Sequence, residues 1–142
     1  MEAAPALAEL NVRIPSDVQY IADIVDEVVR RCAAAEFPRR HLTLNVPVAL
    51  TEAISNAILR GNGEELSRSV HVRARVDTVR LEVEVRDEGD GFDLDLCTAD
   101  PTTADNLVRE DGRGLFLMRS LMDRVERYSD GGNVVRLILH RP

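Results

Sequence analysis

Aromatic side chains are scarce in this sequence: they make up 4% of its 142 residues, and tryptophan is absent. Proteins that bind single-stranded nucleic acid stack its bases on aromatic side chains, so the sequence offers little for that function. Acidic residues outnumber basic ones by 25 to 18, and the net charge of −7 repels nucleic acids and anionic membranes on average. We therefore expect neither a direct nucleic-acid partner nor membrane binding.

Cysteine and histidine are also rare. Cys32 and Cys97 are the only cysteines, and they form no CxxC motif, so a disulfide between them cannot be argued from the sequence. We expect buried or idle thiols instead. The histidines His41, His71 and His140 are isolated from one another and from cysteine, which gives a zinc site little support.

The length of the chain predicts one compact domain, because a typical domain has about 150 residues. Apolar residues make up 44% of the sequence, so a chain of this size can bury a core without metal or disulfide support. We expect a flexible N-terminus over residues 1–9 and a single domain over residues 10–142. Residues 1–10 lack a basic segment followed by a continuous apolar run, which predicts a cytoplasmic protein without a signal peptide.

Two hydrophobic periodicities predict the secondary structure. Alternating apolar and polar residues predict strands near residues 10–14, 70–76, 79–85, 125–128 and 135–139. Apolar residues at helical spacing predict helices over about residues 17–35, 48–60 and 115–123. Ser16 and Gln19 form a capping-box pattern at the start of the first helix. The order of elements predicts an α/β (α+β) two-layer sandwich, with helices packed on one face of a mostly antiparallel sheet.

The two central strands are expected to form a hairpin with a tight turn near Asp77 and Thr78. Such a turn would place Arg73 opposite Glu82, which is a favourable cross-strand pair.

Glu52 and Asn56 are four residues apart in the helix expected over residues 48–60, so their side chains lie on one face. A glutamate can act as a general base, and an asparagine oxygen is a hard ligand suited to Mg²⁺. The same pair is also typical of a solvated helix surface. By itself it does not decide between the two interpretations.

An acidic, glycine-containing segment (DEGDGF, residues 87–92) follows the end of the strand expected over residues 79–85. Gly89 and Gly91 allow the backbone to approach a planar ligand closely. Asp87 can accept a hydrogen bond from an exocyclic amine, such as that of adenine. An acidic turn without a ligand has the same composition, so this alternative stays open.

Gly112, Arg113 and Gly114 stand directly before the helix expected over residues 115–123. Free N–H groups at a helix N-terminus bind phosphate, and Arg113 adds a positive charge. A glycine pair also occurs at an ordinary helix start or lid hinge. The preceding residues, about 92–111, show weak periodicity, which predicts either a lid over the site or a disordered insertion.

In their order and spacing, these motifs resemble the nucleotide site of the GHKL superfamily of Bergerat-fold ATPases, which contains gyrase B and the histidine kinases. Within it, the sequence is most similar to the bacterial anti-sigma-factor serine/threonine kinases. Residues 51–58 (TEAISNAI) with Gly61, and residues 112–118 (GRGLFLM) with 121–123 (LMD), are similar to the N-box and the last glycine box of that family. The resemblance covers about residues 14–139.

This resemblance implies an ATP site that uses Mg²⁺. Glu52 would be the catalytic base that prepares the acceptor serine, Asn56 would coordinate Mg²⁺, and Asp87 would bind the adenine amine. The other nucleotide contacts implied by the resemblance are Arg60, Gly89, Gly91, Phe92, Gly112, Arg113, Gly114, Leu115 and Asn133.

The resemblance also implies partners. A kinase of this family phosphorylates a serine on a STAS-type anti-sigma-factor antagonist and sequesters a sigma factor, usually as a homodimer. Phosphoryl transfer asks a protein mainly for positioning and charge neutralisation, which the residues above can supply. Two alternatives stay open: a non-catalytic ATP-binding regulatory module, and an ATPase in which Glu52 activates water.

Overall fold

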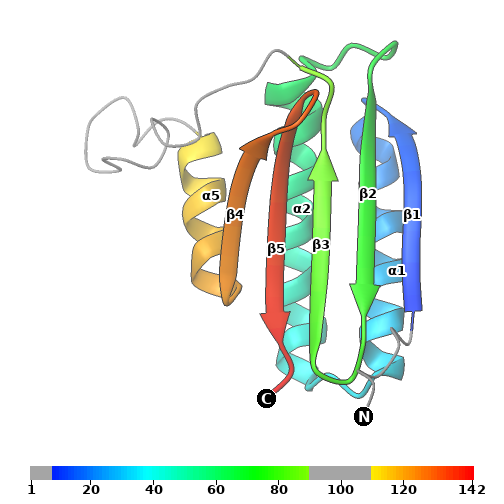
Figure 1. The fold of residues 1–142 in the computed structure, drawn as a ribbon, viewed down its shortest axis with the longest axis vertical. Helices are drawn as coiled ribbons and strands as arrows, with labels where there is room; N and C mark the ends of the chain where they lie inside the picture. Colours follow the sequence, from blue (N-terminus) through cyan, green and yellow to red (C-terminus); the bar gives the residue numbers. More distant parts are fainter. Residues whose placement is uncertain (1–7, 90–109) are drawn as a thin grey trace.

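The computed structural model describes residues 8–89 and 110–142. The strands are β1 (Ala8–Pro15), β2 (Ser69–Val76), β3 (Arg80–Arg86), β4 (Arg124–Ser129) and β5 (Asn133–His140). They form one sheet in the order β1-β2-β3-β5-β4, in which each pair of neighbours is antiparallel. The helices α1 (Ile21–Ala34), α2 (Val46–Asn56) and α5 (Glu110–Leu121) cover one face of this sheet (Figure 1). The predicted two-layer sandwich is therefore confirmed.

Alternation along the strands explains how the sheet joins the helices. The inward-facing residues of the central strands are all at most 1% exposed: Val70, Val72, Ala74, Val76, Leu81, Val83 and Val85. Helix side chains, including Val28, Leu50, Ile54 and Met118, complete the core from the other layer. Each fully buried side chain of this size contributes about 1.5–3 kcal/mol to folding.

Helical backbone continues on both sides of α2, with π-helical turns at His41–Asn45 and Ala57–Gly61. The segment His41–Gly61 is long and apolar enough, by length and composition, to cross a membrane. Its side chains Leu50, Ile54 and Ile58 are instead fully buried beneath the sheet. The helix expected over residues 48–60 thus begins earlier and is the central helix of the core.

The N-terminal boundary and the cap of α1 differ from the expectations. β1 begins at Ala8, and Glu9 pairs with Arg75 across to β2, so neither residue belongs to a flexible tail. At the next boundary, the Asp17 carboxylate accepts the Gln19 N–H at 3.0 Å, at the start of a 3₁₀ turn (Val18–Tyr20) that leads into α1. The Ser16 hydroxyl is therefore not the cap.

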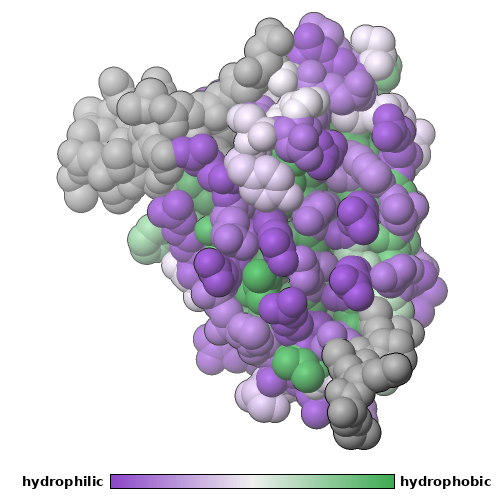
Figure 2. Space-filling model, in the orientation of Figure 1, coloured by the Kyte–Doolittle hydropathy of each residue, from purple (hydrophilic) through white to green (hydrophobic). Residues whose placement is uncertain are grey.

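The outer face of the sheet is covered by charged side chains, and Figure 2 shows this hydrophilic surface. Arg73 lies opposite Glu84, so its expected pairing with Glu82 is wrong. The reason is the Asp77 carboxylate, which accepts hydrogen bonds at 2.7 and 2.8 Å from the backbone N–H groups two and three residues later. The turn is thereby centred on residues 78–79, and a register shift of two residues keeps the same side chains on each face.

Cys32 is fully buried in the core, and burial raises the pKa of its thiol to about 12. A thiol of this kind is unreactive at neutral pH, in agreement with the expectation for this residue. Cys97 lies outside the described residues.

The C-terminal end of α1 provides a test of backbone strain. Glu36 is exposed and has a φ of 64°, in the left-handed region that favours glycine. We expect Glu36→Gly to raise the free energy of unfolding by about 0.5–1 kcal/mol, because relief of the strain exceeds the entropy that glycine adds to the unfolded chain. Urea denaturation would measure this. Ala34→Gly, at the last residue of α1, is the control and should instead lower the free energy of unfolding, by up to about 1 kcal/mol; equal losses in both variants would contradict the prediction.

Candidate functional site

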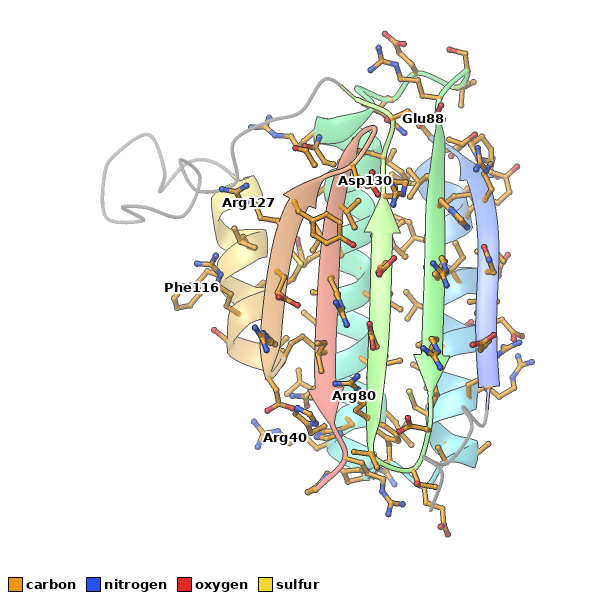
Figure 3. The ribbon with its side chains drawn as sticks, in the orientation of Figure 1. Arg40, Arg80, Glu88, Phe116, Arg127 and Asp130 are labelled. Atoms are coloured by element: carbon orange, nitrogen blue, oxygen red, sulfur yellow. The ribbon has the colours of Figure 1, made fainter. Side chains whose placement is uncertain are left out.

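Three of the segments singled out in the sequence meet at one end of the sandwich, the upper end in Figure 1. They are the residues after β3, the end of the helical segment that contains α2, and the first turns of α5. The turn between β4 and β5 joins them there. Figure 3 shows Glu88 and Asp130 at this end, with Glu88 near the start of β2 and Asp130 near the end of β3 and the start of β5.

Asp87 directly follows β3 and is 3% exposed. Its Oδ1 atom accepts hydrogen bonds from the backbone N–H of Gly89 at 2.9 Å, and from the backbone N–H and side-chain Nδ2 of Asn133, both at 3.2 Å. The Asp87 N–H also donates to the Asn133 carbonyl at 3.0 Å. Three donors therefore fix the orientation of the carboxylate. They all bind Oδ1, so Oδ2 points away from Asn133 and the Gly89 N–H.

Close backbone contacts surround this carboxylate. A Cβ atom added to Gly61 would overlap Asp87 Oδ2, and one added to Gly89 would overlap the Gly61 carbonyl oxygen. On the β5 side, Gly132 has a φ of 146°, and a Cβ there would overlap the Asp87 carbonyl oxygen. These positions need glycine because three segments approach one carboxylate. Gly61 belongs to the N-box resemblance but has no predicted role in the site, and Gly132 is not singled out by the sequence.

The β4–β5 turn is also held to the end of β3 by an ion pair. Arg86 Nη2 lies 3.1 Å from Asp130 Oδ2, and Arg86 donates a second hydrogen bond to the Asp130 carbonyl. Asp130 N–H in turn donates to the Gly132 carbonyl at 3.0 Å. This pairing keeps Asn133 next to Asp87.

Glu52 and Asn56 face the first turns of α5. A Cβ added to Gly114 would lie 2.6 Å from Glu52 Oε2 and 3.3 Å from Asn56 Nδ2. Asn56 is 9% exposed, and its Nδ2 has no hydrogen-bond partner in the part of the chain that the structure describes. A buried polar atom without a partner is costly in a protein that has no ligand for it. The structure thus brings the helix pair and Gly114 together around an unsatisfied amide.

The unsatisfied Asn56 amide beside Gly114 fits the binding of a nucleotide with Mg²⁺. A half-turn of the Asn56 carboxamide would exchange Nδ2 for the oxygen that a hard cation prefers. Among residues 8–89 and 110–142, no cluster of three His, Cys, Asp or Glu side chains could hold a metal ion by itself. Mg²⁺ that is bound together with phosphate needs only one or two protein ligands, and water and phosphate oxygens supply the rest.

Helix α5 begins at Glu110, so the expected helix start after Gly114 is wrong. Acidic residues favour the first turn of a helix, and Glu110 is followed by Asp111. The first N–H groups of a helix have no acceptor within it, so that of Gly112 stays available to a phosphate, whereas that of Gly114 does not. Residues 110–111, expected at the end of the lid, are helical.

The other nucleotide contacts that the resemblance implies are not part of these groups or lie outside the described residues. Arg60 is exposed and directly precedes Gly61. Leu115 is 1% exposed and packs in the core, which explains its apolar side chain without a contact to a ligand, so its assignment as a nucleotide contact stays a prediction. Gly91 and Phe92 lie outside the described residues, as does the predicted lid up to residue 109, and these assignments stay predictions.

Comparisons with known proteins show the family of the chain. A family model described as a histidine kinase-like ATPase domain matches residues 14–139. The serine-protein kinase RsbW of Bacillus velezensis is 31% identical over 137 residues, which cover 90% of this chain and 82% of the relative. RsbW of Bacillus subtilis is 29% identical with the same coverage, and RsbW of Staphylococcus aureus is 24% identical over 138 residues, covering 90% of this chain and 84% of the relative. The chain therefore belongs to the histidine kinase-like ATPase domain family.

Proposed function

We propose that this chain is an ATP-dependent protein-serine kinase that acts as an anti-sigma factor. The observation that carries the proposal is the meeting of Asp87, the Glu52–Asn56 pair and the first turn of α5 at one end of the sandwich. The name of the relatives, serine-protein kinase, supports the reaction, and the chain spans at least 82% of their length.

In this proposal, the two ends of ATP bind to different parts of the site. Asp87 Oδ2 accepts a hydrogen bond from the adenine amine, while Asn133 holds Oδ1. The N–H group of Gly112 binds a phosphate oxygen at the positive end of the α5 dipole, where Arg113 adds a positive charge. Asn56 would hold Mg²⁺, which neutralises phosphate charge when bound.

Glu52 is half-buried beside α5, where it can serve as the general base. Its carboxylate accepts the proton of a serine hydroxyl on a partner protein. The hydroxyl oxygen then forms a bond to the γ-phosphorus as the bond from that phosphorus to the bridging oxygen breaks, and ADP leaves. A carboxylate next to the phosphates also supports the alternative in which it activates water.

We infer the partners from the same family relationship. The acceptor serine would belong to a STAS-type antagonist, and a sigma factor would be sequestered by the kinase when the antagonist is phosphorylated. Such a role places the protein in the cytoplasm, and we propose that it acts as a homodimer.

Transfer of the labelled γ-phosphate of ATP to a STAS-type antagonist tests this function. We expect label on one serine of the antagonist, none on the matching Ser→Ala antagonist, and loss of transfer when EDTA removes the divalent cation. Steady phosphate release without antagonist would instead favour the water-activating ATPase. ATP binding without transfer to any antagonist would favour the non-catalytic module.

A further inference from the structure

Asn62 is a fully buried polar residue to which neither the sequence motifs nor the proposed reaction assigns a role. It directly follows Gly61, at the end of the helical segment that contains α2. Its Nδ2 donates hydrogen bonds to Ser16 Oγ and to the Ser69 carbonyl, both at 2.9 Å. Its Oδ1 accepts the backbone N–H of Glu88 at 2.8 Å.

The orientation of this amide is determined by its partners. A backbone N–H can only donate and a backbone carbonyl can only accept, so Oδ1 must face Glu88 and Nδ2 must face Ser69. Both Nδ2 hydrogens are used. Asn62 therefore links three distant segments: the end of β1, the start of β2 and the residues after β3.

The segment after β3 depends on such a link on its β2 side. Strand pairing between β2 and β3 ends at Arg86, so Glu88 has no sheet partner there. On the β5 side, Asn133 holds Asp87 through both its backbone and its side chain. Asn62 holds the opposite side through Glu88, and the Glu88 carboxylate also accepts the Ser69 N–H.

We propose that Asn62 is a positioning residue for recognition of the adenine ring. By fixing the Glu88 N–H, it keeps the neighbouring Asp87 carboxylate against Gly61. This holds the carboxylate where the adenine amine of the nucleotide would bind. The inference rests on the proposed ATP site. The Asn62 side chain bonds to Ser16, Ser69 and Glu88, on the side of the site where Asp87 lies, so its effect concerns nucleotide binding rather than phosphoryl transfer. Interactions that are equal in the ground and transition states change KM and leave kcat unaltered.

Asn62→Ala tests this role, with Ser16→Ala as the matched control. Ser16→Ala removes a partner from the same network but keeps the hydrogen bonds of Asn62 to Glu88 and Ser69. We expect Asn62→Ala to raise the KM for ATP about tenfold, with kcat within about twofold of wild type. The preference for ATP over ITP, whose base has an oxygen in place of the amine, should fall. Ser16→Ala should change neither, although both variants should unfold at lower temperature.

A second variant and binding measurements complete the test. If Asn62→Ala does not fold, Asn62→Ser leaves space for water to satisfy the freed groups and should give the same increase in KM. A wild-type KM and ATP/ITP preference in the Asn62 variant would overturn the inference, as would an equal change in Ser16→Ala. Failure of the wild-type protein to bind ATP, measured by calorimetry, would overturn the proposed function and the inference with it.

Discussion

Asp87→Asn should weaken ATP binding by about 10- to 150-fold, because a hydrogen bond to a charged group contributes about 1.5–3 kcal/mol. The structure also determines which atom changes. Three donors, from Gly89 and Asn133, surround Oδ1, so the oxygen of the new amide should remain in that place. The NH₂ group would then replace Oδ2 and present a donor to the adenine amine, which is itself a donor.

This reversal predicts a change in selectivity as well as in affinity. ITP carries an acceptor oxygen at the position of the amine, so the variant should lose much less affinity for ITP than for ATP. Calorimetric titration of both nucleotides would measure the ratio. Asp77→Asn is a suitable control, because Asp77 also accepts backbone hydrogen bonds, but in the turn between β2 and β3 at the other end of those strands. Equal affinity losses for the two nucleotides would contradict the proposed adenine contact.

Glu52→Gln should lower the rate of serine phosphorylation by about 100- to 10,000-fold, the usual contribution of a general base. Glutamine has the same shape as glutamate but cannot take up the proton of the acceptor hydroxyl. ATP affinity should stay within a few-fold of wild type, because the proposed contact with the adenine ring is made by Asp87 and not by Glu52. Single-turnover transfer to the antagonist and equilibrium binding of ATP would separate the two effects.

A control for this variant is Glu126→Gln, on the charged outer face of the sheet, which should leave both measurements unchanged. Transfer at the full rate in Glu52→Gln would show that another group accepts the proton. Loss of both transfer and ATP binding would instead assign Glu52 to binding of the nucleotide.

Most of the fold could be predicted from the sequence because strand and helix patterns depend on nearby residues. The alternation of Val70, Val72, Ala74 and Val76 gave the correct buried face of β2. The register between β2 and β3 was wrong because it depends on the position of one turn, which the Asp77 side chain determines. Ser16 illustrates the same limit: a serine side chain suits a helix cap, but the Ser16 hydroxyl donates instead to the carbonyl of Arg68 at 2.7 Å.

The sequence by itself determined the two-layer architecture, the helix face shared by Glu52 and Asn56, and the residue types of the site. The strands, the helices and the face that the pair shares follow from neighbours within about four positions, where the periods of helix and strand apply, and the order of these elements predicts the layers. Only the tertiary structure decided that Gly61 lies against Asp87 and that Asn62 supports the loop beside it. These contacts join residues 26 positions apart, and no local period relates such residues: their meeting depends on how the helices pack beneath the sheet.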